Sequence, residues 1–318
     1  MSLKVALYES EDAMTNILIV IDPEESNYTA LERIKEIPAT ADVDSKVDLY
    51  FNAAPVTARR ANLNSLRESI AAKQAALDKL VTPHKEMGYR ITTSVIQIRR
   101  LCEDIIKSAR DYKADFVFKS VRQHAPLKRM FYTSTDWNLI RMCPTALLLV
   151  RDLGTVRGKP VIGAVNIDDE DPEHLELNRI VLAQANALAE VLAEVLAEVL
   201  GAKVHLIYAY GPAVVMGDGA DPMAYLIAKD KHDAEFKKAK ALASANNVLA
   251  SNTKLRDGTP ETIVTEYAEE ISAEIIVLGT VARSGASGLF NGNTAESMLE
   301  KTQRDMFVIK LESFVSPV

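Results

Sequence analysis

Apolar residues gather in short, nearly continuous runs along this chain, and longer stretches of mixed polarity separate the runs. Two runs resemble each other: NILIVID at 16–22 and KPVIGAVNID at 159–168 both end in a polar residue, and each leads into an acidic loop and a helical stretch. Uninterrupted Val/Ile/Leu runs are typical of parallel strands that are buried on both faces. The pattern therefore predicts that each run begins a separate α/β unit.

The same series of elements follows both runs. After the first run we expect strands at 46–53, 90–98, 115–120 and 145–152, a long helix at 57–87 and a shorter helix at 101–114. After the second run we expect strands at 202–210, 253–257, 274–280 and 306–313, a long helix at 224–249 and a shorter helix at 260–273. Strands that alternate with helices imply right-handed crossovers and parallel pairing. The prediction is an α/β fold with two tandem, open, parallel five-stranded sheets and flanking helices, in a Rossmann-like arrangement.

A short segment separates the two series. RDLGTVRGKP, residues 151–160, is rich in Gly and charge and ends in Pro, as domain linkers often are. We expect a first domain at 1–154 and a second at 155–318. The tetrapeptide LAEV is repeated at 188–199 and predicts helix, because Leu, Ala and Glu are strong helix formers. Two readings stay open: an in-frame expansion that lengthened a helix, or a protruding helix for a partner.

Composition excludes several classes of protein. The 318 residues are 25% charged and 48% hydrophobic, which is typical of globular domains. The net charge of −7 disfavours direct nucleic-acid binding, which relies on neutralising phosphates. Neither a signal peptide nor a run long enough to span a membrane is expected. The two cysteines, which have no CxxC or Cys/His companions, fit a reducing, cytoplasmic location.

One glycine-rich stretch carries candidate binding chemistry. VLGTVARSGASGLFNGNTAESML, residues 277–299, runs from a strand through a loop that contains Gly279, Thr280 and Gly285 to a helix that begins near Asn293. Glycines let backbone amides approach an anion closely, and a helix N-terminus favours negative charge. Open parallel sheets bind ligands at the carboxyl ends of their strands, where this loop lies. The loop predicts a phosphate cradle, either still working or left as a relic.

These motifs and the duplicated layout are similar to the universal stress protein family, and in particular to its tandem-domain members. The resemblance rests on VLGTVARSG, on GNTAE and on TSTDWNLIRMCP in the first half, and it covers residues 16–311. It implies the adenine nucleotide alpha hydrolase-like fold and a role in stress resistance, including resistance to DNA-damaging agents. It also implies pairing of the last strands of the two halves as an intramolecular pseudo-dimer, with further homodimer formation left open.

Nucleotide-binding members of the family carry the pattern G-x2-G-x9-G-[ST]. Gly279 stands at its first glycine and Gly292 at its third, whereas Ala282 replaces the second. Asn293 and Thr294 follow Gly292, whereas the family has a small hydroxyl residue directly after this glycine. The Asp that reads adenosine in those relatives is replaced by Asn166, and Asp168 follows two residues later. The resemblance therefore implies a weakened ATP site, with or without Mg²⁺.

The first half departs further from the family pattern. It keeps Asp22 at the end of its first strand, but no glycine occurs between Ser120 and Met142. A basic loop replaces the cradle, with Arg122, His124, Lys128 and Arg129. Two readings stay open for this loop: a cationic patch for an anionic ligand or for the acidic second half, and a solvated charged loop. Trp137 is expected to be a packing anchor.

No dedicated catalytic machinery is expected. The five histidines lack metal-ligand spacing, so no metal site is predicted; His205 and Cys143 fit structural roles, and a magnesium role for 168–171 is nonspecific. Three functions remain: a stress-resistance factor that binds a small ligand or a partner in the second-half crevice, an ATP-binding or weakly ATP-hydrolysing switch, and a ligand-free interaction scaffold. The Gly/Met-rich segment 211–227 leaves room for a nucleotide or a partly apolar ligand.

Overall fold

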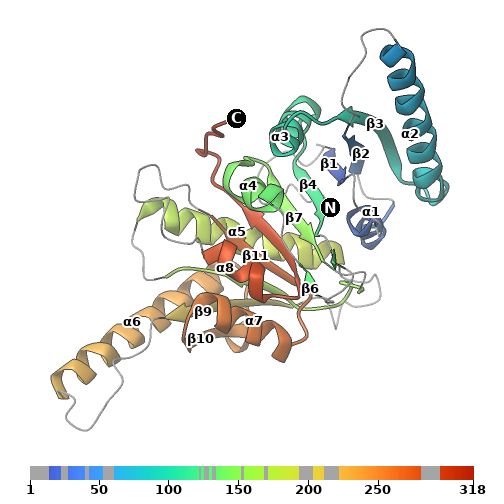
Figure 1. The fold of residues 1–318 in the computed structure, drawn as a ribbon. Coiled ribbons are helices and arrows are strands. Elements are labelled where there is room, and N and C mark those ends of the chain that lie inside the picture. Colours follow the sequence, from blue (N-terminus) through green and yellow to red (C-terminus); the bar gives the residue numbers. More distant parts are fainter. Residues whose placement is uncertain are drawn as a thin grey trace. The chain divides into compact units, whose positions relative to one another are not determined.

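A computed structural model describes residues 14–22, 28–39, 43–52, 61–121, 123–124, 129–130, 134–151, 154–167, 171–192, 203–210, 222–280 and 294–318 (Figure 1). The chain divides into two compact units. Unit 1 consists of residues 1–153 with the C-terminal residues 315–318, and unit 2 consists of residues 154–314. Each unit is described separately below.

Unit 1 contains five parallel strands in the order β3-β2-β1-β4-β7. The strands are β1 (Thr15–Ile21), β2 (Val43–Phe51), β3 (Arg90–Gln97), β4 (Phe116–Ser120) and β7 (Ala146–Val150). The helices are α1 (Thr29–Arg33), α2 (Ala61–Glu86), α3 (Leu101–Tyr112) and α4 (Ser134–Met142), with a 3-10 turn η2 at Ile34–Glu36. The order places β1 in the centre, where Ile17 to Val20 are fully buried.

Unit 2 repeats this order as β10-β9-β8-β11-β12. The strands are β8 (Val161–Ala164), β9 (Val204–Tyr210), β10 (Thr253–Asp257), β11 (Ile275–Gly279) and β12 (Asp305–Ile309). The helices are α5 (Pro172–Leu192), α6 (Pro222–Ala245), α7 (Pro260–Glu270) and α8 (Thr294–Lys301), with a 3-10 turn η3 at Ala250–Asn252. The α/β fold class and its parallel sheets are confirmed.

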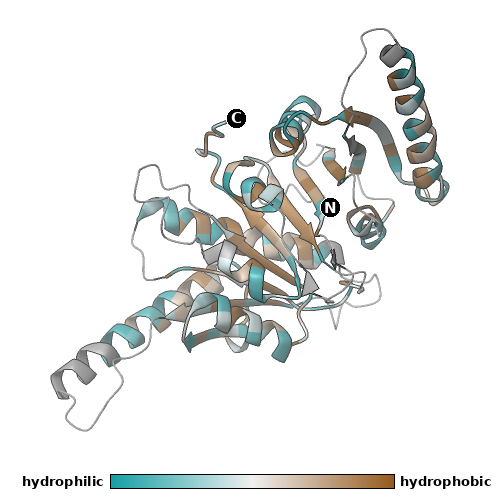
Figure 2. Cartoon of the chain, in the orientation of Figure 1, coloured by the Kyte–Doolittle hydropathy of each residue, from teal (hydrophilic) through white to brown (hydrophobic). Residues whose placement is uncertain are grey.

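Helices cover both faces of the unit 2 strands. A Cβ built on Gly163 would lie 2.7 Å from Cδ2 of Leu182, so α5 lies close against one face of β8. His205 of β9 points to the other face, where it meets Tyr267 of α7. Figure 2 shows hydrophobic residues concentrated on the strands, while hydrophilic residues are frequent on α2 and α6. Burial on both faces explains why the strands read as continuous apolar runs.

Two stretches differ in detail from the sequence-based prediction. The basic loop contains a small antiparallel pair, β5 (Gln123–His124) with β6 (Arg129–Met130), which no sequence pattern predicted. The LAEV repeat is described only up to Leu192, where α5 ends, so the rest of its prediction lies outside the described residues. Among the described helices, none is long and apolar enough to cross a membrane.

Candidate ligand site

The carboxyl ends of β8 and β11 form the centre of the candidate site in unit 2. The two strands are neighbours, with Ala164 in register with Leu278. Asn166 follows β8 by two residues, and Gly279 is the last residue of β11. The fold thus brings together two of the residues that the sequence predicted to act jointly.

Asn178 of α5 holds the main chain at Asn166. Its Oδ1 accepts a hydrogen bond from the amide of Asn166 at 3.0 Å, and its Nδ2 donates to the carbonyl oxygen of Asn166 at 2.6 Å. Asn178 thus gives both the N–H and the C=O of Asn166 a hydrogen-bond partner beyond the end of β8, where pairing with the neighbouring strands no longer does so. The main chain at Asn166 is therefore fixed by a side chain that the sequence did not single out.

Gly279 is required by packing. A Cβ at this position would lie 2.3 Å from Cγ and 2.5 Å from Cδ2 of Leu177, far inside van der Waals contact. The absence of a side chain therefore lets α5 approach the end of β11. The sequence predicted Gly279 as a cradle glycine, and the described structure adds a packing role that does not depend on a ligand.

Thr280 directly follows β11. Its amide donates to the carbonyl oxygen of Ile309 at 2.9 Å, which extends the pairing with β12 by one residue. The residue is 5% exposed, and its Oγ1 has no hydrogen-bond partner among the described residues. A buried hydroxyl without a partner costs free energy, so this oxygen offers a bond to a ligand or to water.

The rest of the predicted cradle lies outside the described residues. This holds for Asp168, Ala282, Gly285, Gly292 and Asn293, and also for Arg122 and Lys128 of the basic loop. Thr294 begins α8, as the prediction of a helix there required. His124 and Arg129 are in register with each other in β5 and β6. Of these candidates, only Thr294, His124 and Arg129 lie within the described residues.

The matching place in unit 1 holds three charged side chains. Lys119 of β4 is fully buried, and its Nζ lies 2.8 Å from Oδ1 of Asp136 and 3.8 Å from Oδ2 of Asp22. Nζ also donates to the carbonyl oxygen of Ser120 at 3.1 Å. Asp22 and Asp136 are both buried as well. We call Lys119, Asp22 and Asp136 the unit 1 triad.

Of the unit 1 triad, only Asp22 was predicted from the sequence, and Lys119 and Asp136 were not. A signal was present, because Lys119 follows three apolar residues within the buried strand Phe116–Ser120. A charge in a strand buried on both faces needs a counter-charge nearby, and Asp136 lies in the first turn of the next helix, α4.

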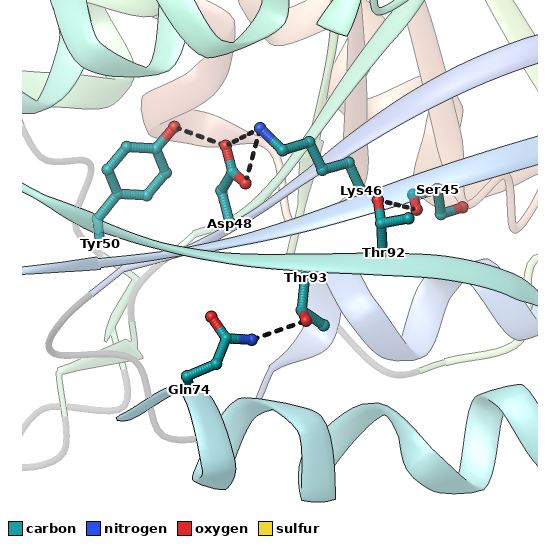
Figure 3. Close-up of polar contacts among 7 residues, drawn as sticks. All are labelled: Ser45, Lys46, Asp48, Tyr50, Gln74, Thr92 and Thr93. Atoms are coloured by element: carbon teal, nitrogen blue, oxygen red, sulfur yellow. Dashed lines mark hydrogen bonds and ion pairs between the residues drawn. The ribbon is translucent and has the colours of Figure 1, made fainter. Parts of the chain in front are cut away.

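A second buried polar group in unit 1 lies along β2 (Figure 3). Asp48 is fully buried, and its carboxylate lies 3.2 Å from Nζ of Lys46 and 3.5 Å from Oη of Tyr50. Desolvation raises the pKa of Asp48 above its usual value, although the Lys46 ammonium opposes the shift. Burial, together with the Asp48 charge, also raises the pKa of Tyr50. The opposite side of the strands carries a separate contact, from Gln74 Nε2 to Thr93 Oγ1 at 2.8 Å.

His205 and Cys143, for which the sequence favoured structural roles, are partly buried and fully buried respectively. Nδ1 of His205 lies 2.7 Å from Oη of Tyr267, and burial followed by the charges of Lys254 and Lys203 lowers the His205 pKa. The side chains of Cys102 and Cys143 are both buried. Within the described part of the chain, no three His, Cys, Asp or Glu side chains are grouped as metal ligands.

Two α/β units with one strand order define a protein with a duplicated parallel α/β fold. The family model described as "Universal stress protein family" matches residues 14–151 and 181–310. The chain belongs to the universal stress protein family and contains its domain twice.

Individual relatives match nearly the whole length of the chain. It is 31% identical to Universal stress protein E of Salmonella typhi over 95% of this chain and 96% of that one. It is 30% identical to Universal stress protein E of Escherichia coli K12, with the same coverage. Among solved structures, it is similar to a protein of unknown function from Pseudomonas aeruginosa PAO1, with a TM-score of 0.73, 22% identity and 94% of each chain covered. A universal stress protein from Archaeoglobus fulgidus gives a TM-score of 0.59 at 15% identity over 92% of this chain and 98% of that one. These last two likenesses concern the fold.

Proposed function

We propose that this protein acts in the stress response by binding a small ligand, with a nucleotide as the leading candidate, in the crevice at the carboxyl ends of β8 and β11 in unit 2. The buried hydroxyl of Thr280, which lacks a hydrogen-bond partner among the described residues, is the observation that carries the proposal. A polar atom held in this state stabilises a complex that completes its hydrogen bond. Asn166 and Gly279 lie at the same strand ends.

The main chain around the proposed site is fixed before a ligand arrives. Asn178 holds Asn166 through both of its main-chain groups, and Leu177 packs against Gly279. A site whose walls are already ordered loses less conformational entropy when it binds. Asn166 differs chemically from the family's Asp because an amide both donates and accepts, whereas a carboxylate only accepts. The proposed site can therefore accept a different hydrogen-bonding pattern on the ligand.

The test is titration calorimetry with MgATP and ADP on the full chain and on Thr280→Val. Valine keeps the shape of the side chain but lacks the hydroxyl, so nucleotide affinity should fall about 5- to 10-fold. The folded state should become no less stable, because the variant removes a buried polar atom. Thr253→Val in β10 is the matched control, since Thr253 is also buried but its Oγ1 already donates to the carbonyl oxygen of Leu249. Equal affinity of wild type and Thr280→Val would remove Thr280 from the site.

A second candidate function is the ATP-binding or weakly ATP-hydrolysing switch. The retention of Gly279 and Gly292 in the family pattern favours it. Ala282→Gly restores the missing glycine, so the variant should bind ATP more tightly if the loop keeps the cradle geometry. An unchanged affinity would argue for a ligand other than ATP. No catalytic base is assigned.

A ligand-free scaffold is the third reading. Native mass spectrometry of the purified protein, followed by denaturing extraction, distinguishes it from the other two. A released nucleotide or a partly apolar molecule supports binding, whereas a bare mass combined with no response to any nucleotide supports the scaffold. Pairing of the last strands, further homodimers and a cytoplasmic location remain parts of the same proposal, as does resistance to DNA-damaging agents. Survival of a deletion strain after ultraviolet exposure tests the last of these.

A further inference from the structure

The two units differ at the place where a ligand would bind. Strand registers align them: Val20 pairs with Lys119 in unit 1, and Ala164 pairs with Leu278 in unit 2. Lys119 therefore corresponds to Leu278, and by the same alignment Asp22 corresponds to Asn166. Neither Asn166 nor Leu278 carries a charge, so the cation and its partner carboxylate are special to unit 1.

The third member of the unit 1 triad also has an uncharged counterpart. The amide of Cys143 donates to the carbonyl oxygen of Leu139, and the amide of Thr302 donates to that of Met298, which aligns α4 with α8. Asp136 then corresponds to Ala295. Asp136 lies in the first turn of α4, where the helix dipole stabilises a negative charge. Its carboxylate thus belongs to the N-terminal end of α4, and helix N-termini are where α/β proteins bind the anionic groups of ligands.

Together these positions give unit 1 both an anion and a cation of its own. The Asp136 carboxylate occupies the helix N-terminus, and the Lys119 ammonium neutralises it at 2.8 Å while also facing Asp22 at 3.8 Å. All three side chains are buried, with exposures of 0% for Lys119 and Asp136 and 2% for Asp22. Buried charges are tolerated when they have counter-charges nearby, and here the protein itself supplies both the cation and the anions.

We propose that the Lys119 side chain is a permanent, built-in ligand of the unit 1 crevice, so that only unit 2 remains open and each chain binds one small molecule. The part about unit 2 rests on the proposed function, but the role of Lys119 does not. Removing the Lys119 side chain beyond Cβ leaves a cavity faced by Asp22 and Asp136. This cavity should accept a small primary alkylammonium ion in place of the lost one.

The experiment is thermal unfolding of full-length Lys119→Ala with added propylammonium chloride. The variant alone should lose roughly 10 °C in Tm, because the buried carboxylates lose the lysine ammonium. Millimolar propylammonium should then recover several degrees, whereas 1-propanol and sodium chloride at the same concentration should not. Leu278→Ala is the matched control: it empties the equivalent position of unit 2 but faces no such pair of carboxylates, so it should respond equally to the amine and the alcohol. A Tm of Lys119→Ala close to that of wild type, or no preference for the amine, overturns the proposal.

A double variant covers the case in which Lys119→Ala does not fold. Lys119→Leu with Asp136→Ala carries the unit 2 residues at both positions. It should unfold at a higher temperature than Lys119→Leu alone, because removing Asp136 also removes a buried negative charge that has lost its ammonium. A double variant that is less stable than the single one would contradict the assignment of Lys119 as the counter-ion of Asp136.

Ligand stoichiometry tests the remaining part. Calorimetry or native mass spectrometry with ADP should give one molecule per chain, and two per chain would show that unit 1 is open. If neither ADP nor ATP binds and no molecule co-purifies with the chain, the proposed function of unit 2 is wrong. The propylammonium response still decides the role of Lys119 in that case, so the two failures can be told apart.

Discussion

The side chain of Leu177 lies so close to Gly279 that a Cβ on the glycine would come within 2.3 Å of Cγ of Leu177. This contact joins α5 to the end of β11 at the candidate ligand site. The clash involves the branch point of the leucine as well as its methyl ends, so a change of rotamer at the tip does not relieve it. The close approach of helix and strand depends on the absence of a side chain.

Gly279→Ala should therefore destabilise the protein by about 1–3 kcal/mol, as overpacking of a tight core does. Gly279→Ala should cost less in a Leu177→Ala background than in the wild type, because the smaller side chain makes room for the new methyl group. Gly154→Ala is the control, since a Cβ there meets no atom within 4 Å, and its effect should stay within about 0.5 kcal/mol. Urea unfolding monitored by circular dichroism measures the wild type, the three single variants and the double variant. Equal stability of Gly279→Ala and wild type would contradict the packing role.

His205 should make the protein less stable as the pH falls below neutrality. Burial lowers its pKa in the folded state, so the unfolded chain takes up a proton first, from about pH 6.5 downwards. The contribution of His205 is thus fully present above pH 6.5 and is lost as the pH falls towards its folded pKa. His205→Gln should flatten this part of the stability profile measured by denaturant unfolding.

Tyr267→Phe distinguishes burial from hydrogen bonding at His205. It removes the hydroxyl that lies 2.7 Å from Nδ1 but keeps the ring. Burial is the main cause of the lowered pKa of His205, so the slope between pH 6.5 and lower values should survive in this variant. A flat profile in Tyr267→Phe would instead assign the shift to the hydrogen bond.

His84 in unit 1 has a pKa lowered mainly by burial, so His84→Gln should remove a further part of the slope.

Asp48 should behave in the opposite sense. Its folded pKa is raised above 3.8, chiefly by desolvation, so folding favours its protonated form. This contribution is present below pH 3.8 and is lost as the pH rises through the folded pKa. Asp48→Asn should therefore stabilise the protein at pH 7, on the order of 1 kcal/mol.

The gain from Asp48→Asn should shrink as the pH approaches 4, where the wild-type carboxyl also becomes neutral. Lys46, which is 21% exposed, is free to turn its ammonium to solvent in this variant. Asp44→Asn on the same strand is the control, since its side chain is 38% exposed. If Asp48→Asn lowered stability equally at pH 4 and pH 7, the hydrogen bonds of Asp48 would outweigh its desolvation.

Both thiols should be inert in the folded protein. Burial raises the pKa of Cys102 to about 12, so almost no thiolate forms at neutral pH, and Cys143 is 1% exposed. A chromogenic disulfide reagent should therefore label no cysteine in the native protein and two in urea. Rapid native labelling would show that this part of unit 1 opens readily.

The sequence alone determined the architecture of both units. Continuous apolar runs such as Ile17–Ile21 indicate strands buried on both faces, and the repeated order of elements indicates the duplication. Gly279 and Thr280 were also predictable as candidates, because they lie at the carboxyl end of a parallel strand, where open α/β sheets bind ligands. Asn166 was implied by the resemblance to the family. The architecture itself needs only local pattern and the handedness of βαβ connections.

Only the tertiary structure decided what these residues do there. Asn178 and Leu177 both come from α5, where Asn178 bonds to Asn166 and Leu177 packs against Gly279, far along the chain in β11. No local pattern marks a helix residue that bonds to a strand end or covers it. Likewise, Lys119 and Asp136 are ordinary charged residues in the sequence. They become a buried pair 2.8 Å apart because the fold brings the end of β4 to the first turn of α4. Side-chain partners of this kind depend on distances across the fold, which hydrophobic periodicity does not encode.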